Sequence, residues 1–166
     1  MLRLSKKADY ALIAMNHLAR KQGSPCASTS ARDIAERYDI PIELMAKVLQ
    51  RLVRTGLLVS TQGTRGGYML SRASGAISVA DVIQAIDGPF TVTACSSDKH
   101  DCDQYSKCNV RGPLWQIRER IVATLGMVSI AEMAADSEPA TAVAAELSVV
   151  RRSGMPVSAG HGPRQG

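Results

Sequence analysis

Three of the four cysteines in this 166-residue chain lie close together, at Cys95, Cys102 and Cys108. Six residues separate the first pair and five separate the second, and the segment is polar with no apolar period. Burial in a core therefore does not explain these cysteines. Thiolates clustered on a loop can bind one soft metal centre, either zinc or an iron–sulfur cluster. Because the spacing is wider than that of most paired zinc ligands, it favours a cluster.

Two other interpretations of the cysteines stay open. A zinc ion would make the loop a structural element, and pairs of the thiols could form a redox-active disulfide without metal. Three cysteines are one too many for a single disulfide. The fourth, Cys26, lies alone after Gly-Ser-Pro and is interpreted as a buried or idle thiol.

The charge of the chain is divided unevenly. Residues 1–75 contain 12 Lys and Arg against 5 Asp and Glu, a net charge of +7, whereas residues 76–166 contain 8 against 10, a net charge of −2. The basic half is the part expected to bind a polyanion such as DNA. A solvated basic surface would give the same excess, so charge alone does not decide.

Several function classes find no support in the sequence. No stretch approaches the ~20 apolar residues of a membrane span, and charges occupy the place of a signal peptide's apolar core. We therefore expect a cytoplasmic protein without a membrane partner, where a cysteine cluster indicates metal or redox chemistry. No catalytic triad, zinc-protease motif or phosphate-binding loop is evident, so we expect neither an enzyme nor a small-molecule substrate.

The elements that would position these residues begin with helices. Ser5 is a suitable N-cap for the first helix, and Ser30 with Asp33 forms a capping-box pattern that starts the second. Pro41 suits the start of the third helix and Gly56 its end. Helical spacing of apolar residues predicts these three helices over about residues 6–21, 31–38 and 41–55.

A β-hairpin follows the third helix. Residues 57–61 and 68–71 have strand character, and the glycine-rich tip between them contains Arg65. Helix, turn, helix and hairpin in this order predict a winged helix-turn-helix. The expected fold class is mostly α with a small β-hairpin.

The winged helix predicts where DNA would bind. The second helix of the pair enters the major groove, and a wing tip reaches the neighbouring minor groove or its phosphates. Backbone amides at a helix N-terminus form a further phosphate-binding site. The predicted DNA contacts are therefore Lys47, Gln50, Arg51 and Arg54 on the helix, Arg65 on the wing, and Ser30. For each cation, an ordinary solvated position is the alternative.

The second half contains three more predicted helices. A capping box at Ser78 starts one that runs to about Ile86, a longer one begins at Pro113, and Ser129 caps a last short one. The long helix needs a partner for its apolar stripe, either a second copy in a dimer or the chain's own core. The stripe consists of Trp115, Ile117, Ile121, Val122 and Leu125.

The predicted domain organisation follows from these elements. Residues 1–75 form the winged helix-turn-helix DNA-binding domain, and residues 76–135 contain the cysteine loop and the dimerisation helices. From 136 to 166 the composition turns to Ala, Ser, Gly, Pro and Val, which is typical of a disordered tail.

Four stretches of the sequence resemble a known family, the IscR/NsrR-type winged-helix iron–sulfur regulators. They are Leu4-Ser-Lys-Lys-Ala-Asp-Tyr-Ala, Gly63-Thr-Arg-Gly-Gly-Tyr-Met-Leu, Ile77-Ser-Val-Ala-Asp-Val-Ile and the three-cysteine loop before Trp115. The runs Gly88-Pro-Phe-Thr-Val-Thr-Ala-Cys-Ser and Cys108-Asn-Val-Arg-Gly are most similar to regulators of SUF iron–sulfur cluster assembly. The resemblance covers about residues 1–135.

The resemblance implies a homodimeric transcription factor whose cluster state sets its affinity for operator DNA. It implies Cys95, Cys102 and Cys108 as cluster ligands, with a [2Fe–2S] cluster favoured over [4Fe–4S]. The closest subfamily implies control of SUF genes, and a nitric-oxide-responsive repressor of the same family is an alternative.

The resemblance leaves the fourth cluster ligand open. One branch of the family uses a histidine three residues after the last cysteine, but this chain has Arg111 there. Another uses an acidic residue in the first helix of the partner subunit, and Asp9 matches that position. The competitors within the loop are His100, Asp101 and Asp103.

Overall fold

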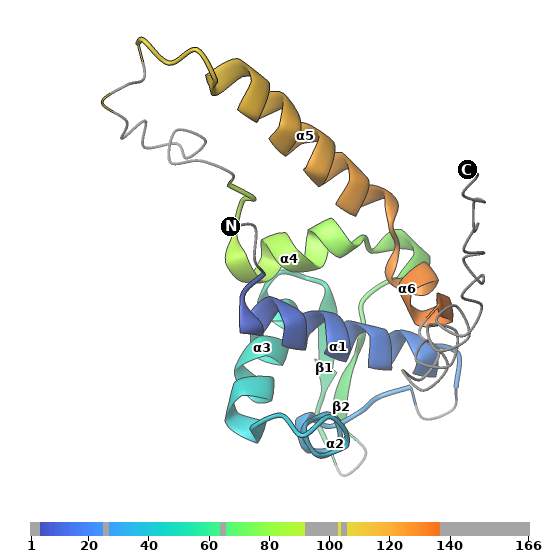
Figure 1. Ribbon diagram of the computed structural model, residues 1–166. Coiled ribbons are helices and arrows are strands. Elements are labelled where there is room, and N and C mark those ends of the chain that lie inside the picture. The colour runs from blue at the N-terminus through green and yellow to red at the C-terminus, as the bar shows by residue number, and fades with distance from the viewer. Residues whose placement is uncertain (1–3, 25–26, 64–65, 92–102, 104–105, 137–166) are drawn as a thin grey trace, which may run out of the picture. The chain divides into compact units, whose positions relative to one another are not determined.

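The computed structural model describes residues 4–24, 27–63, 66–91, 103 and 106–136 (Figure 1). Met1–Ala135 form one compact unit, and nearly all of the second, Asp136–Gly166, lies outside the described residues. The elements are α1 (Lys6–Lys21), α2 (Ala31–Arg37), α3 (Ile42–Arg54), β1 (Leu58–Thr61), β2 (Gly67–Leu70), the 3₁₀ helix η1 (Ser74–Ala76), α4 (Val79–Asp87), α5 (Arg111–Met127) and α6 (Ile130–Asp136). The predicted fold class, mostly α with a small β-hairpin, is confirmed.

The predicted capping residues begin the helices as expected. The Ser5 side chain accepts a hydrogen bond from the amide of Ala8 at the start of α1. Ser30 and Asp33 form a reciprocal capping box at α2: the Asp33 amide donates to Ser30 Oγ at 3.1 Å, and the Ser30 amide donates to Asp33 Oδ2 at 3.3 Å. Gly56, with φ of 75°, follows α3 in the left-handed region that favours glycine.

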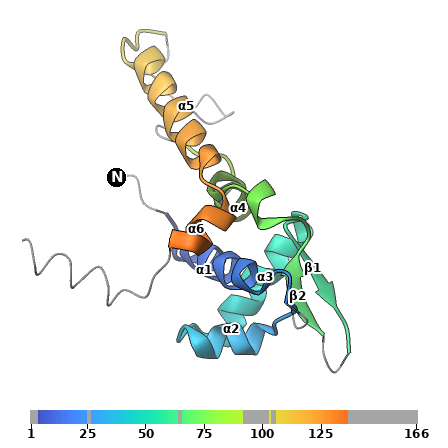
Figure 2. The same ribbon diagram turned by 90° about the vertical axis from the view of Figure 1, so that its right-hand side faces the viewer.

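The core lies around α1. Both views show α1 between α4 on one side and α2 and α3 on the other (Figures 1 and 2). Its buried face comes from small and apolar residues at helical spacing, and the neighbouring helices add wholly buried aliphatic side chains. The largest core residues include Met15, Leu18, Ile34, Leu49, Leu52 and Val82.

The hairpin is attached to the segment before α2. Thr29 and Tyr68 exchange two backbone hydrogen bonds, of 3.0 Å from the Thr29 amide and 2.9 Å from the Tyr68 amide. Gly67 lies so close to this segment that an added Cβ would meet the Thr29 carbonyl oxygen at 2.7 Å. The strand base is therefore fixed relative to the helix-turn-helix, which positions the wing.

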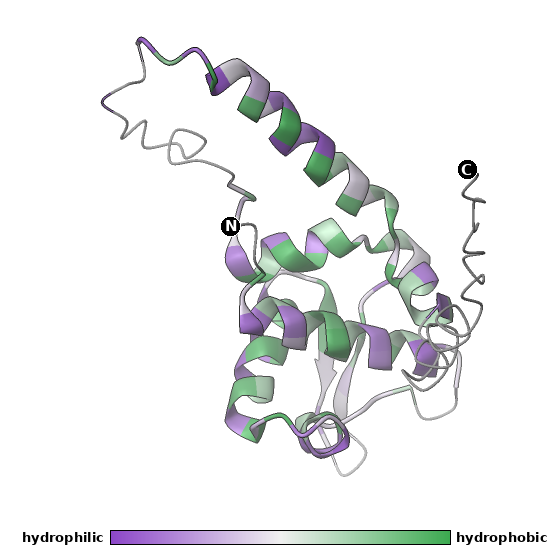
Figure 3. Ribbon diagram, in the orientation of Figure 1, coloured by the Kyte–Doolittle hydropathy of each residue, from purple (hydrophilic) through white to green (hydrophobic). Residues whose placement is uncertain are grey.

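Helix α5 contributes little to the core. It contains no buried residue, and polar and apolar residues alternate along it (Figure 3). Trp115 is 48% exposed and Ile117 46% exposed. Of the predicted apolar stripe, Leu125 packs against the core. Ile121 and Val122 are half-buried, so among the described residues the part of the stripe left exposed is its beginning, at Trp115 and Ile117.

One histidine of α1, His17, is buried and faces Tyr38, the residue that follows α2. His17 Nδ1 is 3.2 Å from the Tyr38 hydroxyl, and the two rings meet edge to face with centroids 5.7 Å apart. Burial lowers the pKa of His17 below 6.5, and the charges of Lys21, Arg37 and Arg20 lower it further against a smaller opposing effect of Asp33. The neutral imidazole is thus part of the folded core.

None of the described helices is long and apolar enough to cross a membrane.

Candidate nucleic-acid interface and metal-binding loop

The outer face of α3 carries the residues that the sequence predicts to contact DNA. Met45, Val48, Leu49 and Leu52 are buried against α1 and the rest of the core. The helical period then places Lys47, Gln50, Arg51 and Arg54 on the opposite side, and all four are exposed. The structure thus brings four of the six predicted DNA contacts together on one helix face.

Arg51 differs from its three neighbours because it already has a protein partner. Its Nε donates a hydrogen bond of 2.9 Å to the carbonyl oxygen of Ala85, in α4. A DNA contact by Arg51 would therefore use the terminal nitrogens of the guanidinium. The same bond links α3 directly to α4.

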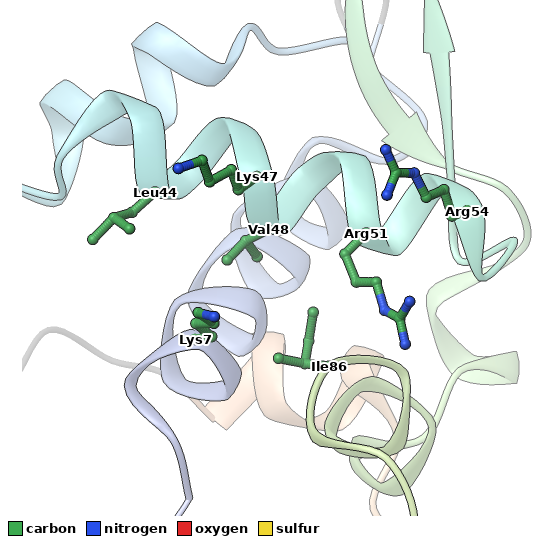
Figure 4. A pocket seen from close by; sticks show the side chains of 7 residues that line it. All are labelled: Lys7, Leu44, Lys47, Val48, Arg51, Arg54 and Ile86. Carbon is green, nitrogen blue, oxygen red and sulfur yellow. The ribbon is translucent and has the colours of Figure 1, made fainter.

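A cleft opens between α1, α3 and α4 (Figure 4). Its volume is about 290 Å³. Basic side chains surround it, and apolar side chains from α3 and α4 lie between them. The lining residues are Lys7, Leu44, Lys47, Val48, Arg51, Arg54 and Ile86.

The other two predicted DNA contacts lie apart from α3. Ser30 is half-buried, and its amide donates a hydrogen bond to Asp33. A contact between Ser30 and phosphate would therefore use the Ser30 hydroxyl as the donor. Arg65 lies outside the described residues. Of the neighbouring described residues, the Gly66 amide donates a hydrogen bond of 2.9 Å to the Gly63 carbonyl oxygen.

The end of α4 and the residues just after it are bonded to three other parts of the fold. The Asp87 carboxylate, at the end of α4, accepts hydrogen bonds from the Ser5 hydroxyl and amide. The Phe90 carbonyl accepts a 2.6 Å hydrogen bond from Arg118 Nε, and the Arg118 guanidinium lies 5.1 Å from the Trp115 ring centroid. With the Arg51–Ala85 bond, residues 85–90 thus contact α1, α3 and α5.

Of the predicted cluster ligands, the structure describes Cys108 and Asp9. Cys108 is a free, half-buried thiol shortly before α5. Asp9 is half-buried in the first turn of α1. Cys95 and Cys102 lie outside the described residues, as do the competitors His100 and Asp101, while Asp103 is exposed. The described residues alone bring no three metal-binding side chains together.

Of the three predicted thiolate donors, the described residues include Cys108, and its chemistry suits an iron–sulfur cluster. Iron–sulfur clusters are bound chiefly by thiolates, and Cys108 is neither buried in the apolar core nor paired in a disulfide. The sequence between the end of α4 at Asp87 and the start of α5 at Arg111 contains all three of these cysteines.

Sequence reasoning missed the bonds that hold residues 85–90. In the sequence, Asp87 belongs to a helix stop signal, and Arg118 is one of several polar residues on a predicted helix. A carboxylate that accepts bonds from Ser5, 82 positions earlier in the chain, leaves no local pattern.

The comparisons with known proteins agree with this architecture. The model of the Rrf2 family, described as an iron-dependent transcriptional regulator, matches residues 4–136. The HTH-type transcriptional regulator IscR of Xenorhabdus nematophila is 35% identical over 139 residues, which cover 82% of each protein.

Among solved structures, CymR, the global cysteine regulator of B. subtilis, is similar with a TM-score of 0.66 at 26% identity, covering 83% of this chain and all of that one. IscR of T. potens is similar with a TM-score of 0.64 at 27% identity, covering 84% of this chain and 90% of that one. The relatives are transcriptional regulators, which supports DNA binding and excludes an enzyme. The chain therefore belongs to the Rrf2 family of winged-helix transcriptional regulators.

Proposed function

We propose that this regulator is a homodimer whose affinity for operator DNA depends on an iron–sulfur cluster held by Cys95, Cys102 and Cys108. The observation that carries the proposal is the set of bonds at residues 85–90. The segment that leads into the cysteine loop is bonded to α3: Arg51 Nε donates a hydrogen bond of 2.9 Å to the Ala85 carbonyl oxygen. A change in the loop would therefore act directly on α3.

The DNA contacts in this proposal are those on α3, with Arg65 of the wing and Ser30 of α2. Lys47 and Arg54 provide exposed charge for phosphates, and Gln50 provides an amide for base edges. Arg51 contacts DNA through its terminal nitrogens while its Nε holds Ala85.

When bound, the cluster would supply a centre that oxygen, nitric oxide or iron scarcity can change. This chain's own residues would pass on the change. Asp87 holds the start of α1, Ala85 holds Arg51, and Phe90 is held by Arg118 of α5. A switch requires that two arrangements of the loop favour different positions of α3.

Dimerisation is proposed through α5. Trp115 and Ile117 are about half exposed on a helix without buried residues. A second copy of the chain would bury these apolar side chains and so stabilise the helix. The partner's Asp9 is the proposed fourth ligand, which would make cluster binding depend on the dimer. Asp103, exposed in the same loop, is the competitor that the structure describes.

The target genes are proposed from similarity. The relatives named IscR and the SUF-like sequence around Cys95 and Cys108 favour control of iron–sulfur cluster assembly genes by a cytoplasmic regulator. A [2Fe–2S] cluster is proposed over [4Fe–4S].

The experiment that tests the cluster is anaerobic purification followed by visible absorption and iron and sulfide analysis. A coloured protein with iron and sulfide in equal amounts supports the proposal, and the iron content per chain separates two-iron from four-iron forms. Colourless protein with one zinc per chain would leave a regulator with a structural metal. Reversible disulfide formation without iron would indicate a thiol-redox regulator instead.

A variant separates the cluster from the fold. Cys102→Ala should abolish cluster binding while circular dichroism stays unchanged, because the winged helix has an apolar core of its own. Unfolding of this variant would show that the metal is structural.

A further inference from the structure

The cleft between α1, α3 and α4 brings a basic residue of α1 to the DNA-binding face. Lys7 lies across the cleft from Val48 of α3 (Figure 4). It adds a fourth cation to Lys47, Arg51 and Arg54, which come from α3. We propose that this cleft seats a phosphodiester of the DNA backbone, and that Lys7 contacts it. The proposal rests on the proposed DNA contacts of α3 and extends them to a second helix.

Charge supports an anionic occupant. Lys7, Lys47 and Arg54 have no ion pair within the described part of the chain. The acceptors at the end of α4 are already bonded: the Ala85 carbonyl oxygen accepts from Arg51, and both carboxylate oxygens of Asp87 accept from Ser5. The cations therefore remain available to an external anion.

The position of Lys7 is unfavourable for the isolated helix. Lys7 occupies the first turn of α1, where the helix dipole is positive and disfavours cations. An anion in the cleft would be attracted by both the lysine and the dipole. A contact with phosphate thus accounts for a charge that the helix itself does not favour.

The walls of the cleft are fixed before DNA binds. Ser5 and Asp87 join the start of α1 to the end of α4, with 2.5 Å between Ser5 Oγ and Asp87 Oδ1. Arg51 and Ala85 join α3 to the same turn of α4. A site with fixed walls loses less conformational entropy on binding.

The lining also favours DNA over a small free anion. Leu44, Val48 and Ile86 give the cleft an apolar part beside the cations. A deoxyribose next to its phosphate can cover such a surface, whereas inorganic phosphate cannot. DNA carries both groups at every step of its backbone.

The test measures the salt dependence of DNA binding for matched variants. Lys6→Gln is the control for Lys7→Gln, because Lys6 is the preceding residue of the same turn, is exposed, and does not line the cleft. The DNA is a duplex that the unmodified protein selects from a random library. Affinity is measured by fluorescence anisotropy over a range of salt concentrations, with circular dichroism melts of each variant.

Lys7→Gln should reduce the slope of log affinity against log salt by about 0.9 per bound chain, since one phosphate contact is lost. Lys6→Gln should leave the slope within error of the unmodified protein, and Lys7→Arg should retain it. Equal slopes for Lys7→Gln and Lys6→Gln would overturn the assignment. If the unmodified protein selects no DNA, the proposed function itself fails.

A second arm distinguishes DNA from a free anion. Inorganic phosphate titrated without DNA, against chloride at matched ionic strength, should show no saturable binding by calorimetry. Saturable phosphate binding that Lys7→Gln abolishes would mean that the cleft serves a small anion and would contradict the DNA assignment.

Discussion

Asp87 accepts two hydrogen bonds from Ser5, with 2.5 Å from Ser5 Oγ to Oδ1 and 3.2 Å from the Ser5 amide to Oδ2. Ser5 also caps α1 by accepting from the Ala8 amide at 3.1 Å. The helix that carries Lys7 and Asp9 is thereby bonded to the residue just before the cysteine loop. In this structure, the end of α4 and the start of α1 are thus joined directly.

A double-mutant cycle should measure this coupling. Asp87→Ala should lower the free energy of unfolding by about 1 kcal/mol through lost hydrogen bonds. Ser5→Ala should lower it by ~1–2 kcal/mol because the cap is lost as well. Urea unfolding should give a double variant more stable than the sum of the single effects predicts, by at least ~0.5 kcal/mol. Additive effects would mean that the pair contributes nothing in solution.

The position of the wing should depend on Gly67. Gly67→Ala would bring a Cβ to 2.7 Å from the Thr29 carbonyl oxygen and so displace β2 from Thr29. We expect a loss of ~1–3 kcal/mol in unfolding free energy and weaker DNA binding. Gly126→Ala is the control, because its Cβ would meet nothing within 4 Å in α5. A Gly67→Ala protein with unchanged DNA affinity would show that the wing needs no fixed base.

The stability of the fold should decrease in acid because of His17. Its pKa is lowered in the folded state by burial, so the unfolded chain binds the proton more tightly. The unfolding free energy should therefore fall as the pH drops below the unfolded value of 6.5, and level off below the folded pKa. His17→Gln should flatten this dependence in urea titrations at a series of pH values. A variant that retains the full slope would assign the effect to other groups.

Dimerisation should depend on the exposed side of α5. Ile117→Glu places a charge on a side chain that is 46% exposed here and should give a monomer in analytical ultracentrifugation. Gln116→Glu, an exposed neighbour, adds the same charge and should leave the dimer intact. A dimer that survives Ile117→Glu would place the interface elsewhere.

The helix-turn-helix could be predicted from sequence because its signals are local. Ser30 and Asp33 lie three residues apart, and Gly56 directly follows the last turn of α3. Such patterns depend on hydrogen bonds within one turn, so one sequence is enough to find them.

The coupling between elements could not be predicted in the same way. Arg51 looks like any outward cation of α3, and its bond to Ala85 depends on how α4 packs against α3. Lys7 joins Lys47 in a cleft only because α1 and α3 approach each other there. Tertiary packing decides both contacts, and residue spacing in the sequence does not reveal how helices pack.

The measurement that tests the central claim most directly is the operator affinity of the same protein with and without its cluster. Both forms are prepared anaerobically, and their DNA binding is compared at one salt concentration. A cluster that biases α3 through residues 85–90 should change the affinity by about tenfold or more, a coupling of ~1.4 kcal/mol. Equal affinities for the two forms would contradict a cluster-sensing regulator, even if the protein binds both iron and DNA.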